Sequence, residues 1–282
     1  MMKIIDAANE DFVDRWINSR LNSTVKELNK ALEDFELTNS SKLIYSFIWT
    51  DFCDWYIELI KNRFYSDDPI VKADAAQKAV GIFDNILRLL HPFMPYITEE
   101  LWQLIKERGM GDSISIAKFP ETDESKVDLA GEKQMEFLQN LITAVRNIRG
   151  EMKIAPSKPV KLYLKTEVFD PLYADLIKKL AKVEEIVAGN ETIKPPKSAS
   201  AVIKDCEIYV PLEGLIDIEV ERTRLEKEIE RIKGGLFGLD KKLSNQEFVS
   251  RAPVDIIERE RSKKRDWEES LSKLEAILAD LS

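Results

Sequence analysis

The chain has 282 residues, of which 44% are hydrophobic, so it is long enough for two or three domains and is not disordered as a whole. Charged residues make up 33%, and glycine and proline are sparse at 10 and 11, a composition that favours long helices with charged outer faces. The formal net charge of −9 excludes a general polyanion binder, because the mean field of the chain repels phosphate.

Targeting and metal-binding signals are missing from the sequence. The two cysteines, Cys53 and Cys206, and the single histidine, His91, are too few for a zinc site of the usual kind, so we expect no metal. The N-terminus has no apolar core of a signal peptide, and no apolar run is long enough to cross a bilayer. A cytoplasmic protein without membrane segments is predicted.

Residues 1–111 are predicted to form an antiparallel helical bundle. The first helix carries apolar residues at alternating steps of four and three between Phe12 and Phe35. Three further amphipathic helices follow, the last starting near Pro95, and short connections join them. The stretches expected to cap or end these helices are Thr38–Ser41, Ser66–Pro69, His91–Pro92 and Gly109–Gly111.

Residues 112–132 are predicted to be a linker, in which the alternating Ile114 and Ile116 indicate a short extended piece. Residues 133–215 are expected to form a small α/β domain. Its predicted elements are a helix from Met135 to Ile148 closed by Gly150, a strand at 160–164, a helix at 171–180, and strands at 201–203 and 206–210.

Residues 216–282 show two heptad seams separated by a break at 244–253. The break is too short for parallel pairing within one chain, so an antiparallel coiled-coil hairpin with arms of roughly 40 Å is predicted. Gly234-Gly235 and the polar seam residues Glu260 and Lys264 are expected to weaken its middle. The predicted fold class is therefore mainly α, with a helical bundle, a small α/β unit and a C-terminal hairpin.

No catalytic signature is present, because the sequence lacks a P-loop, a GxGxxG and an HExxH. His91 lies between Leu90 and Pro92 at a helix end, a position typical of a structural cap. The adjacent Glu99 and Glu100 point in different directions in a first helical turn, where acids are favoured by the helix dipole. We therefore expect no catalytic residue in this chain.

Positive charge is concentrated in two segments of this acidic chain. Residues 133–165 hold seven basic and two acidic residues, and residues 231–265 hold ten basic and five acidic residues. Arg146 and Arg149 are spaced to share a helix face, and the second cluster lies in the distal half of the hairpin. Such surfaces suit contact with a phosphate backbone, the alternative being an ordinary solvated coiled-coil surface.

Aromatic residues crowd the second helix, and at helical spacing most of them are predicted to be core. The stretch Lys61–Tyr65 differs, because it interleaves charge with aromatic rings at a helix end. Exposed rings there would stack on unpaired bases while Lys61 or Arg63 contacts phosphate.

Several stretches resemble class I aminoacyl-tRNA synthetases. Asp14–Leu21 and Phe52–Glu58 are similar to the first two helices of their anticodon-binding bundle, and His91–Trp102 is the strongest match. Val145–Arg149 with Lys153–Pro156, and the hairpin with Leu243–Asn245, Phe248-Val249 and Ala252-Pro253, resemble the valyl-tRNA synthetase family. The family's HIGH and KMSKS signatures do not occur, and Lys194–Ser198 is similar to the second only superficially.

The resemblance implies a C-terminal, tRNA-binding part of such a ligase. The bundle would receive the anticodon stem-loop, while the α/β unit and hairpin brace the elbow side of tRNA(Val). ATP would be used by a catalytic domain outside this chain. The chain itself is expected to hold no cofactor and to be inactive alone. We also expect it to be monomeric and to need no obligate protein partner. The residues predicted to contact tRNA are Arg15, Arg20, Lys61, Arg63, Tyr65, Arg146, Arg149, Lys241, Lys242, Arg259 and Lys263.

Two alternatives remain at this level. One is the same module from an isoleucyl or leucyl enzyme, although two cysteines cannot supply the zinc module in which the isoleucyl enzyme often ends. The other is a non-enzymatic scaffold whose bundle and coiled coil bind helices of other proteins.

Overall fold

The computed structural model describes the backbone of residues 2–167, 169–245 and 253–281, and the side chains of these residues apart from 2–11 and 254. The chain divides into two compact units, Met1–Gln139 and Asn140–Ser282. Helix α6 (Leu129–Glu151) contributes residues to both units.

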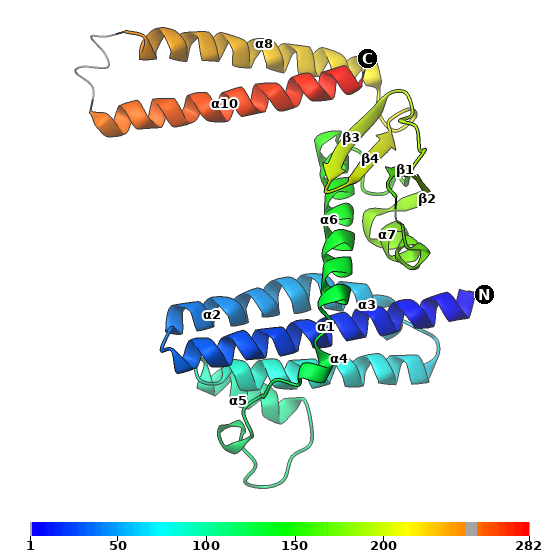
Figure 1. The fold of residues 1–282 in the computed structure, drawn as a ribbon, viewed down its shortest axis with the longest axis vertical. Coiled ribbons are helices and arrows are strands. Elements are labelled where there is room, and N and C mark those ends of the chain that lie inside the picture. Colours follow the sequence, from blue (N-terminus) through cyan, green and yellow to red (C-terminus); the bar gives the residue numbers. More distant parts are fainter. Residues whose placement is uncertain (1, 168, 246–252, 282) are drawn as a thin grey trace. The chain divides into compact units, whose positions relative to one another are not determined.

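The first unit is a helical bundle (Figure 1). Its long helices are α1 (Met2–Glu33), α2 (Leu37–Ser46), α3 (Ile57–Phe64), α4 (Pro69–Leu90) and α5 (Pro95–Leu104). α1 contacts α2, α3 and α4, and α5 packs on α4. Trp16, Ile17 and Leu28 are buried in its core, as the apolar spacing along the first helix predicted.

A π-helix, Phe47–Tyr56, joins α2 to α3, so that residues 37–64 run as one helical segment. The sequence pattern did not predict this wider turn. The π-helix buries Phe47, Asp51, Phe52 and Tyr56, so the acidic Asp51 belongs to the same buried set as three aromatic residues.

The predicted capping residues gave two outcomes. Asp68 caps α4 as expected, because its carboxylate accepts a hydrogen bond from the Ile70 amide at 2.8 Å and Pro69 occupies the first turn. The prediction for Thr38–Ser41 was wrong, since α2 already begins at Leu37. Ser40 and Ser41 lie inside the first turns and donate to the carbonyls of Glu36 and Thr38, both at 3.0 Å.

The prediction of an extended piece at Ile114 and Ile116 was also wrong. Ile114–Ile116 is a short 3-10 helix, η2, followed by another, η3 (Glu124–Lys126). The carboxylate of Glu99 on α5 accepts hydrogen bonds from the Ser113 hydroxyl at 2.6 Å and the Ile114 amide at 3.1 Å, which fixes the start of η2. α5 ends at Leu104, five residues before the glycine pair expected to end it.

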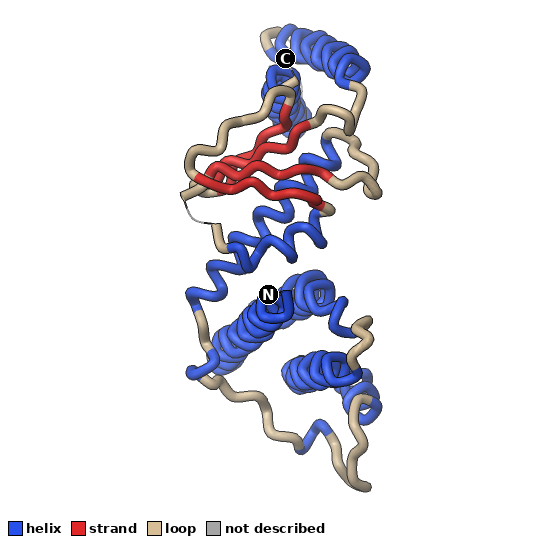
Figure 2. Tube along the Cα trace, turned by 90° about the vertical axis from the view of Figure 1, so that its right-hand side faces the viewer, coloured by secondary structure: helices blue, strands red, loops and turns tan. Residues whose placement is uncertain are grey.

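The second unit contains a four-stranded mixed sheet in the order β2-β1-β4-β3 (Figure 2). Its strands are β1 (Val160–Lys165), β2 (Val183–Gly189), β3 (Ser198–Ile203) and β4 (Cys206–Pro211), with β1 and β2 parallel and the other pairs antiparallel. A 3-10 turn, η4 (Pro171–Tyr173), and α7 (Ala174–Ala181) connect β1 to β2.

Sequence reasoning missed β2, because this edge strand carries Glu184 and Glu185 in place of a clean apolar alternation. Sequence reasoning also placed the end of the helix now labelled α6 at Gly150. α6 instead runs through Gly150 to Glu151, and the backbone turns at Lys153, whose φ of 51° is left-handed.

The C-terminal helices α8 (Ile218–Leu243) and α10 (Val254–Asp280) pair as an antiparallel hairpin, which we call the arm (Figure 1). The predicted seam on α8 is confirmed from Leu225 to Leu239, whereas Leu243 at its end is half-buried; the buried members are Leu225, Ile229, Ile232, Leu236 and Leu239. Polar seam residues are paired across the arm: Glu260 accepts from Lys242, and Lys264 contacts Asp240, both at 2.6 Å. Residues 246–252, which include Phe248-Val249, Arg251 and Ala252, lie outside the described residues.

Gly235 has a packing role that the sequence did not reveal. The ring of Trp267 on α10 lies against it so closely that a Cβ atom added at Gly235 would stand 1.9 Å from the ring. The expectation that this glycine weakens the arm therefore needs correction, because its lack of a side chain admits the largest residue of the α10 seam.

We predict that Gly235→Ala destabilises the second unit by about 1–3 kcal/mol, since the methyl group overpacks the Trp267 contact. Thermal unfolding followed by circular dichroism measures this. Gly150→Ala is the matched control, because an added Cβ there meets nothing and alanine is the better helix former. An equal or higher melting temperature for Gly235→Ala would show that the close contact is not formed.

Candidate nucleic-acid interface

Arg63 at the end of α3 is committed to a buried ion pair. The side chain is only 5% exposed, and its two terminal nitrogens donate to the two carboxylate oxygens of Asp14 at 2.8 and 2.7 Å. Lys78 on α4 contacts the same carboxylate at 2.9 Å, and the Tyr56 hydroxyl donates to it at 3.2 Å. Four helical segments therefore meet at Asp14.

Burial by itself raises the pKa of Asp14, but the hydrogen bonds and charges of Arg63 and Lys78 outweigh it, and the net pKa lies below the ordinary value. Burial and the neighbouring Asp14 carboxylate raise the pKa of Tyr56. The group is thus a charged, ion-paired cluster, and we assign Arg63 to the fold instead of to RNA contact.

Arg20 is engaged in a second internal link. Its guanidinium donates to Asp51 on the π-helix and to Glu132 on α6, each at 3.0 Å. Glu132 also accepts from the hydroxyls of Ser19 and Ser23 at 2.5 and 3.0 Å. These bonds fix the start of α6 on α1, so we do not carry Arg20 forward as an RNA contact.

The basic surface predicted around Arg146 and Arg149 is only partly formed. Arg149 is 8% exposed and donates to the carbonyls of Ala155 and Pro156 at 3.0 and 3.3 Å. Burial lowers the pKa of this guanidinium. Arg146 is exposed, but it also donates to the Leu180 carbonyl at the end of α7, at 3.0 Å. The α6 spacing alone could not reveal that the chain folds back over Arg149 at residues 155 and 156.

The other predicted residues of the bundle lie on its surface. Tyr65 follows α3 with 76% of its surface exposed, and Lys61 is exposed one turn earlier, paired with Glu58 at 3.1 Å. Arg15 is exposed on α1. Exposed aromatic and cationic side chains at a helix end provide what an unstacked base and its phosphate require.

The predicted basic residues of the arm are all exposed. Lys241 has no ion-pair partner among the described residues, whereas Lys242 contacts Glu260 across the arm. Arg259 and Lys263, one turn apart on α10, share a helix face, and the Lys263 ammonium lies 4.8 Å from the centre of the Trp267 ring. All four predicted cations of the arm are therefore accessible, whereas of the predicted pair on α6 only Arg146 is exposed.

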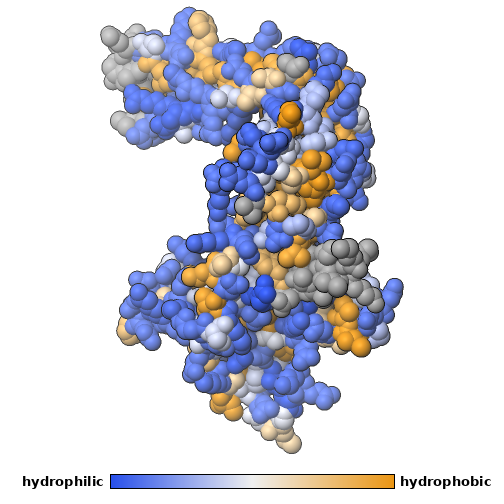
Figure 3. Space-filling model, turned by 45° about the vertical axis from the view of Figure 1, so that its right-hand side comes forward, coloured by the Kyte–Doolittle hydropathy of each residue, from blue (hydrophilic) through white to orange (hydrophobic). Residues whose placement is uncertain are grey.

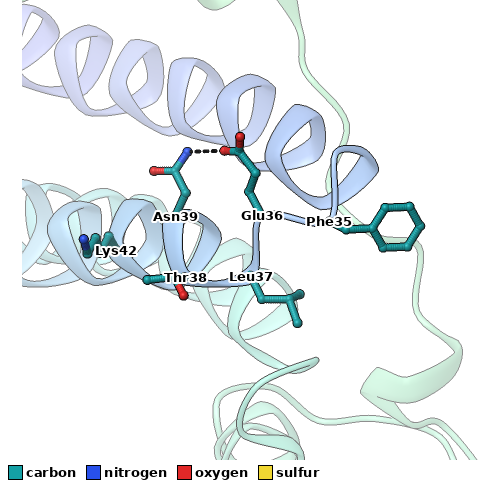
Figure 4. A pocket seen from close by; sticks show the side chains of 6 residues that line it. All are labelled: Phe35, Glu36, Leu37, Thr38, Asn39 and Lys42. Atoms are coloured by element: carbon teal, nitrogen blue, oxygen red, sulfur yellow. Dashed lines mark hydrogen bonds between the residues drawn. The ribbon is translucent and has the colours of Figure 1, made fainter.

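Further exposed aromatic residues lie at the turn between α1 and α2. Phe35, expected on the apolar face of the first helix, is 88% exposed with a left-handed φ of 58°, because α1 ends two residues earlier. It borders an open pocket with Glu36, Leu37, Thr38, Asn39 and Lys42 (Figure 4). Tyr45 and Trp49 stack on the surface of the same helical segment, with ring centres 6.3 Å apart.

Hydrophilic side chains dominate the face of the molecule shown in Figure 3, and apolar patches interrupt them. Within the described residues, no helix is long and apolar enough to span a membrane, and no three His, Cys, Asp or Glu side chains are grouped to hold a metal ion.

His91 bonds to the hydroxyls of Thr98 at 2.7 Å and Ser115 at 3.2 Å, contacts that fit the structural role predicted for it.

Comparison with known families identifies the class. Residues 14–164 match the anticodon-binding domain of tRNA ligases, and residues 217–282 match the tRNA-binding arm of valyl-tRNA synthetases. The first match spans more than half of the chain, and the chain belongs to this family of anticodon-binding domains.

The particular ligase is indicated by similar proteins. The chain is 41% identical over 280 residues to a valine–tRNA ligase of Thermotoga maritima, 38% identical over 284 residues to that of Geobacillus stearothermophilus and 40% identical over 279 residues to that of Enterococcus faecalis. These alignments cover 97–99% of this chain but 31–32% of the relatives. The chain thus spans about a third of their length and corresponds to the C-terminal region of valyl-tRNA synthetase.

We predict that Arg63→Leu lowers the free energy of unfolding by about 3–5 kcal/mol, because it leaves the buried Asp14 carboxylate with Lys78 as its remaining cation. Denaturant titration measures this. Lys61→Leu on the same helix is the control and should change stability by less than about 0.5 kcal/mol, since Lys61 is exposed.

The Asp14 cluster makes the stability of the fold depend on pH in the acid range. Because the folded-state pKa of Asp14 is lowered, its stabilising contribution is present above the ordinary Asp value of 3.8 and is lost as the pH falls through the lower folded value. Asp14→Asn should therefore be less stable at neutral pH and lose less stability than the wild type below about pH 4. Parallel pH profiles would contradict this assignment.

Proposed function

We propose that the chain is the tRNA-binding part of a valine–tRNA ligase and holds tRNA(Val) for aminoacylation. The observation that carries the proposal is the arm, where Lys241, Arg259 and Lys263 remain exposed near the turn in a chain with a net charge of −9. Its match to the tRNA-binding arm of valyl-tRNA synthetases supports the same reading. Cations held on a helical hairpin can neutralise phosphates of a folded RNA.

The bundle would receive the anticodon stem-loop at the junction between α3 and α4. There Tyr65 offers an exposed ring, and Lys61 and Arg15 offer positive charge. The Arg63 cluster keeps the end of α3 rigid, since its guanidinium also reaches Asp74 on α4 at 3.3 Å. A rigid platform reduces the ordering entropy that binding must overcome.

The chemistry of aminoacylation, with ATP as cofactor, would lie in a catalytic domain for which this chain shows no signature. The residues of this chain would bind and orient tRNA only. We further propose that it acts as a cytoplasmic monomer without an obligate protein partner. The valyl arm match and the valine–tRNA ligase relatives favour this ligase over the isoleucyl and leucyl alternatives.

We predict that the chain binds tRNA(Val) with a dissociation constant that rises steeply with salt, and that it does not aminoacylate. A log–log slope of about 3–6 is expected if four to seven phosphates are neutralised. Fluorescence anisotropy at 50–300 mM KCl with labelled tRNA(Val), and with tRNA(Ile) for comparison, measures affinity and preference. Absent binding at the lowest salt, or a flat salt response, would refute the proposal.

We also predict that Lys241→Glu combined with Arg259→Glu weakens tRNA binding and reduces the salt slope by about 2, because two phosphate contacts are lost. The melting temperature should hardly change, since both side chains are exposed. Lys227→Glu is the control on α8, exposed but far along the helix from the basic end, and it makes half the charge change of the double variant. If the control costs half or more of the binding free energy that the double variant costs, net charge explains the loss and the basic end of the arm has no specific role.

A further inference from the structure

Three glycines occur within five residues of α8, at 234, 235 and 238. Glycine in a helix interior is less favourable than any residue except proline, so each needs a reason. Gly235 has one, because the Trp267 ring occupies the space where its side chain would stand. At Gly234 and Gly238 an added Cβ meets nothing within 4 Å, so packing within the described chain does not explain them.

The side chain between these glycines is equally unusual. Phe237 is 73% exposed, although the neighbouring Leu236 and Leu239 are buried in the seam of the arm. Gly234 precedes Phe237 by one helical turn, Gly238 adjoins it, and Lys241 follows it by one turn, so these residues share the outward face of α8. The exposed Phe237 ring therefore lies beside two residues without side chains, and Lys241 adds a positive charge at one end of this surface.

The charges around this surface fit an anionic ligand. Lys241 has no ion-pair partner among the described residues. Asp240, the nearest acid on α8, is held by Lys264 at 2.6 Å, which reduces its repulsion of a phosphate. Lys233, one turn before Phe237, contacts Glu275 on α10 at 2.7 Å and belongs to the pairing of the arm.

A nucleobase is the ligand whose shape and chemistry match. It is flat, it stacks on aromatic rings, and each base in a strand is followed by a phosphate within reach of a neighbouring lysine. Glycine is often found where a ligand approaches the backbone closely. Because Gly234 and Gly238 have no side chains, a base or ribose beside the Phe237 ring could contact the helix backbone directly. A larger side chain at Gly234 or Gly238 would clash with a base or ribose in that position.

We propose that Gly234, Phe237 and Gly238 form a stacking platform for an exposed nucleobase of the bound tRNA, with Lys241 on the adjacent phosphate. This inference rests on the proposed tRNA-binding function of the arm and adds to its phosphate contacts a contact with a base. It gives the unfavourable glycines of α8 a function in binding.

The test compares tRNA(Val) affinity and melting temperature for single variants of the whole chain. Phe237→Ala should weaken binding by about 5- to 150-fold, the range expected for loss of one base–aromatic stack, and Phe237→Trp should retain it. Phe237→Leu should fall between them, because it keeps apolar surface but lacks a π face. Since the side chain is exposed, all three should melt near the wild-type temperature.

The glycine variants separate a binding role from a structural one. Gly234→Ala and Gly238→Ala should raise the melting temperature, because alanine is the better helix former, and at the same time weaken tRNA binding. Gly81→Ala on α4 is the control: an added Cβ there also meets nothing, so it should stabilise without changing affinity. A purely structural role for the glycines would not give opposite signs in the two measurements.

The outcomes distinguish this inference from the function on which it rests. If the wild-type chain binds tRNA(Val) and Phe237→Ala binds equally well, the stacking platform is overturned while the proposed function stands. If both glycine variants bind as tightly as the wild type, the open backbone has no role and the platform is likewise overturned. If the wild-type chain binds no tRNA, the proposed function and the platform both fail.

Discussion

The ion pair between Arg63 and Asp14 is the contact on which the bundle depends. Asp14 lies on α1 and Arg63 at the end of α3, and the added contacts of Tyr56 and Lys78 bring the π-helix and α4 to the same carboxylate. A buried charge that loses its partner is strongly destabilising, so the four segments hold one another in a single arrangement. Tyr65 lies on the surface two residues beyond Arg63.

The arm depends on a different constraint, the close approach of its two helices at Gly235 and Trp267. Ion pairs from Lys233, Lys242 and Lys264 to the facing helix fix the same antiparallel register on both sides of that contact. Two helices paired in a defined register can hold their charges in a defined arrangement, which is what recognition of RNA by shape requires.

Positive charge therefore serves two purposes in this acidic chain. Arg20, Arg63 and Arg149 make contacts inside the protein, where a planar guanidinium can donate hydrogen bonds to several acceptors at once. Other cations stay accessible, among them Lys241, Arg259 and Lys263 on the arm and Lys61 at the end of α3. Local surfaces of this kind can bind a polyanion even though the net charge repels it.

The sequence by itself determined the helical class, the hairpin and the family, because heptad and amphipathic spacing are local properties and the motifs are contiguous. It also placed the cap of α4 within Ser66–Pro69, since capping involves neighbouring residues only. The tertiary structure decided which arginines are accessible: Arg63 meets Asp14, 49 residues away, and no local pattern encodes that partnership. It likewise decided that Gly235 is a packing requirement while Phe237 faces solvent, because both depend on where a second helix lies.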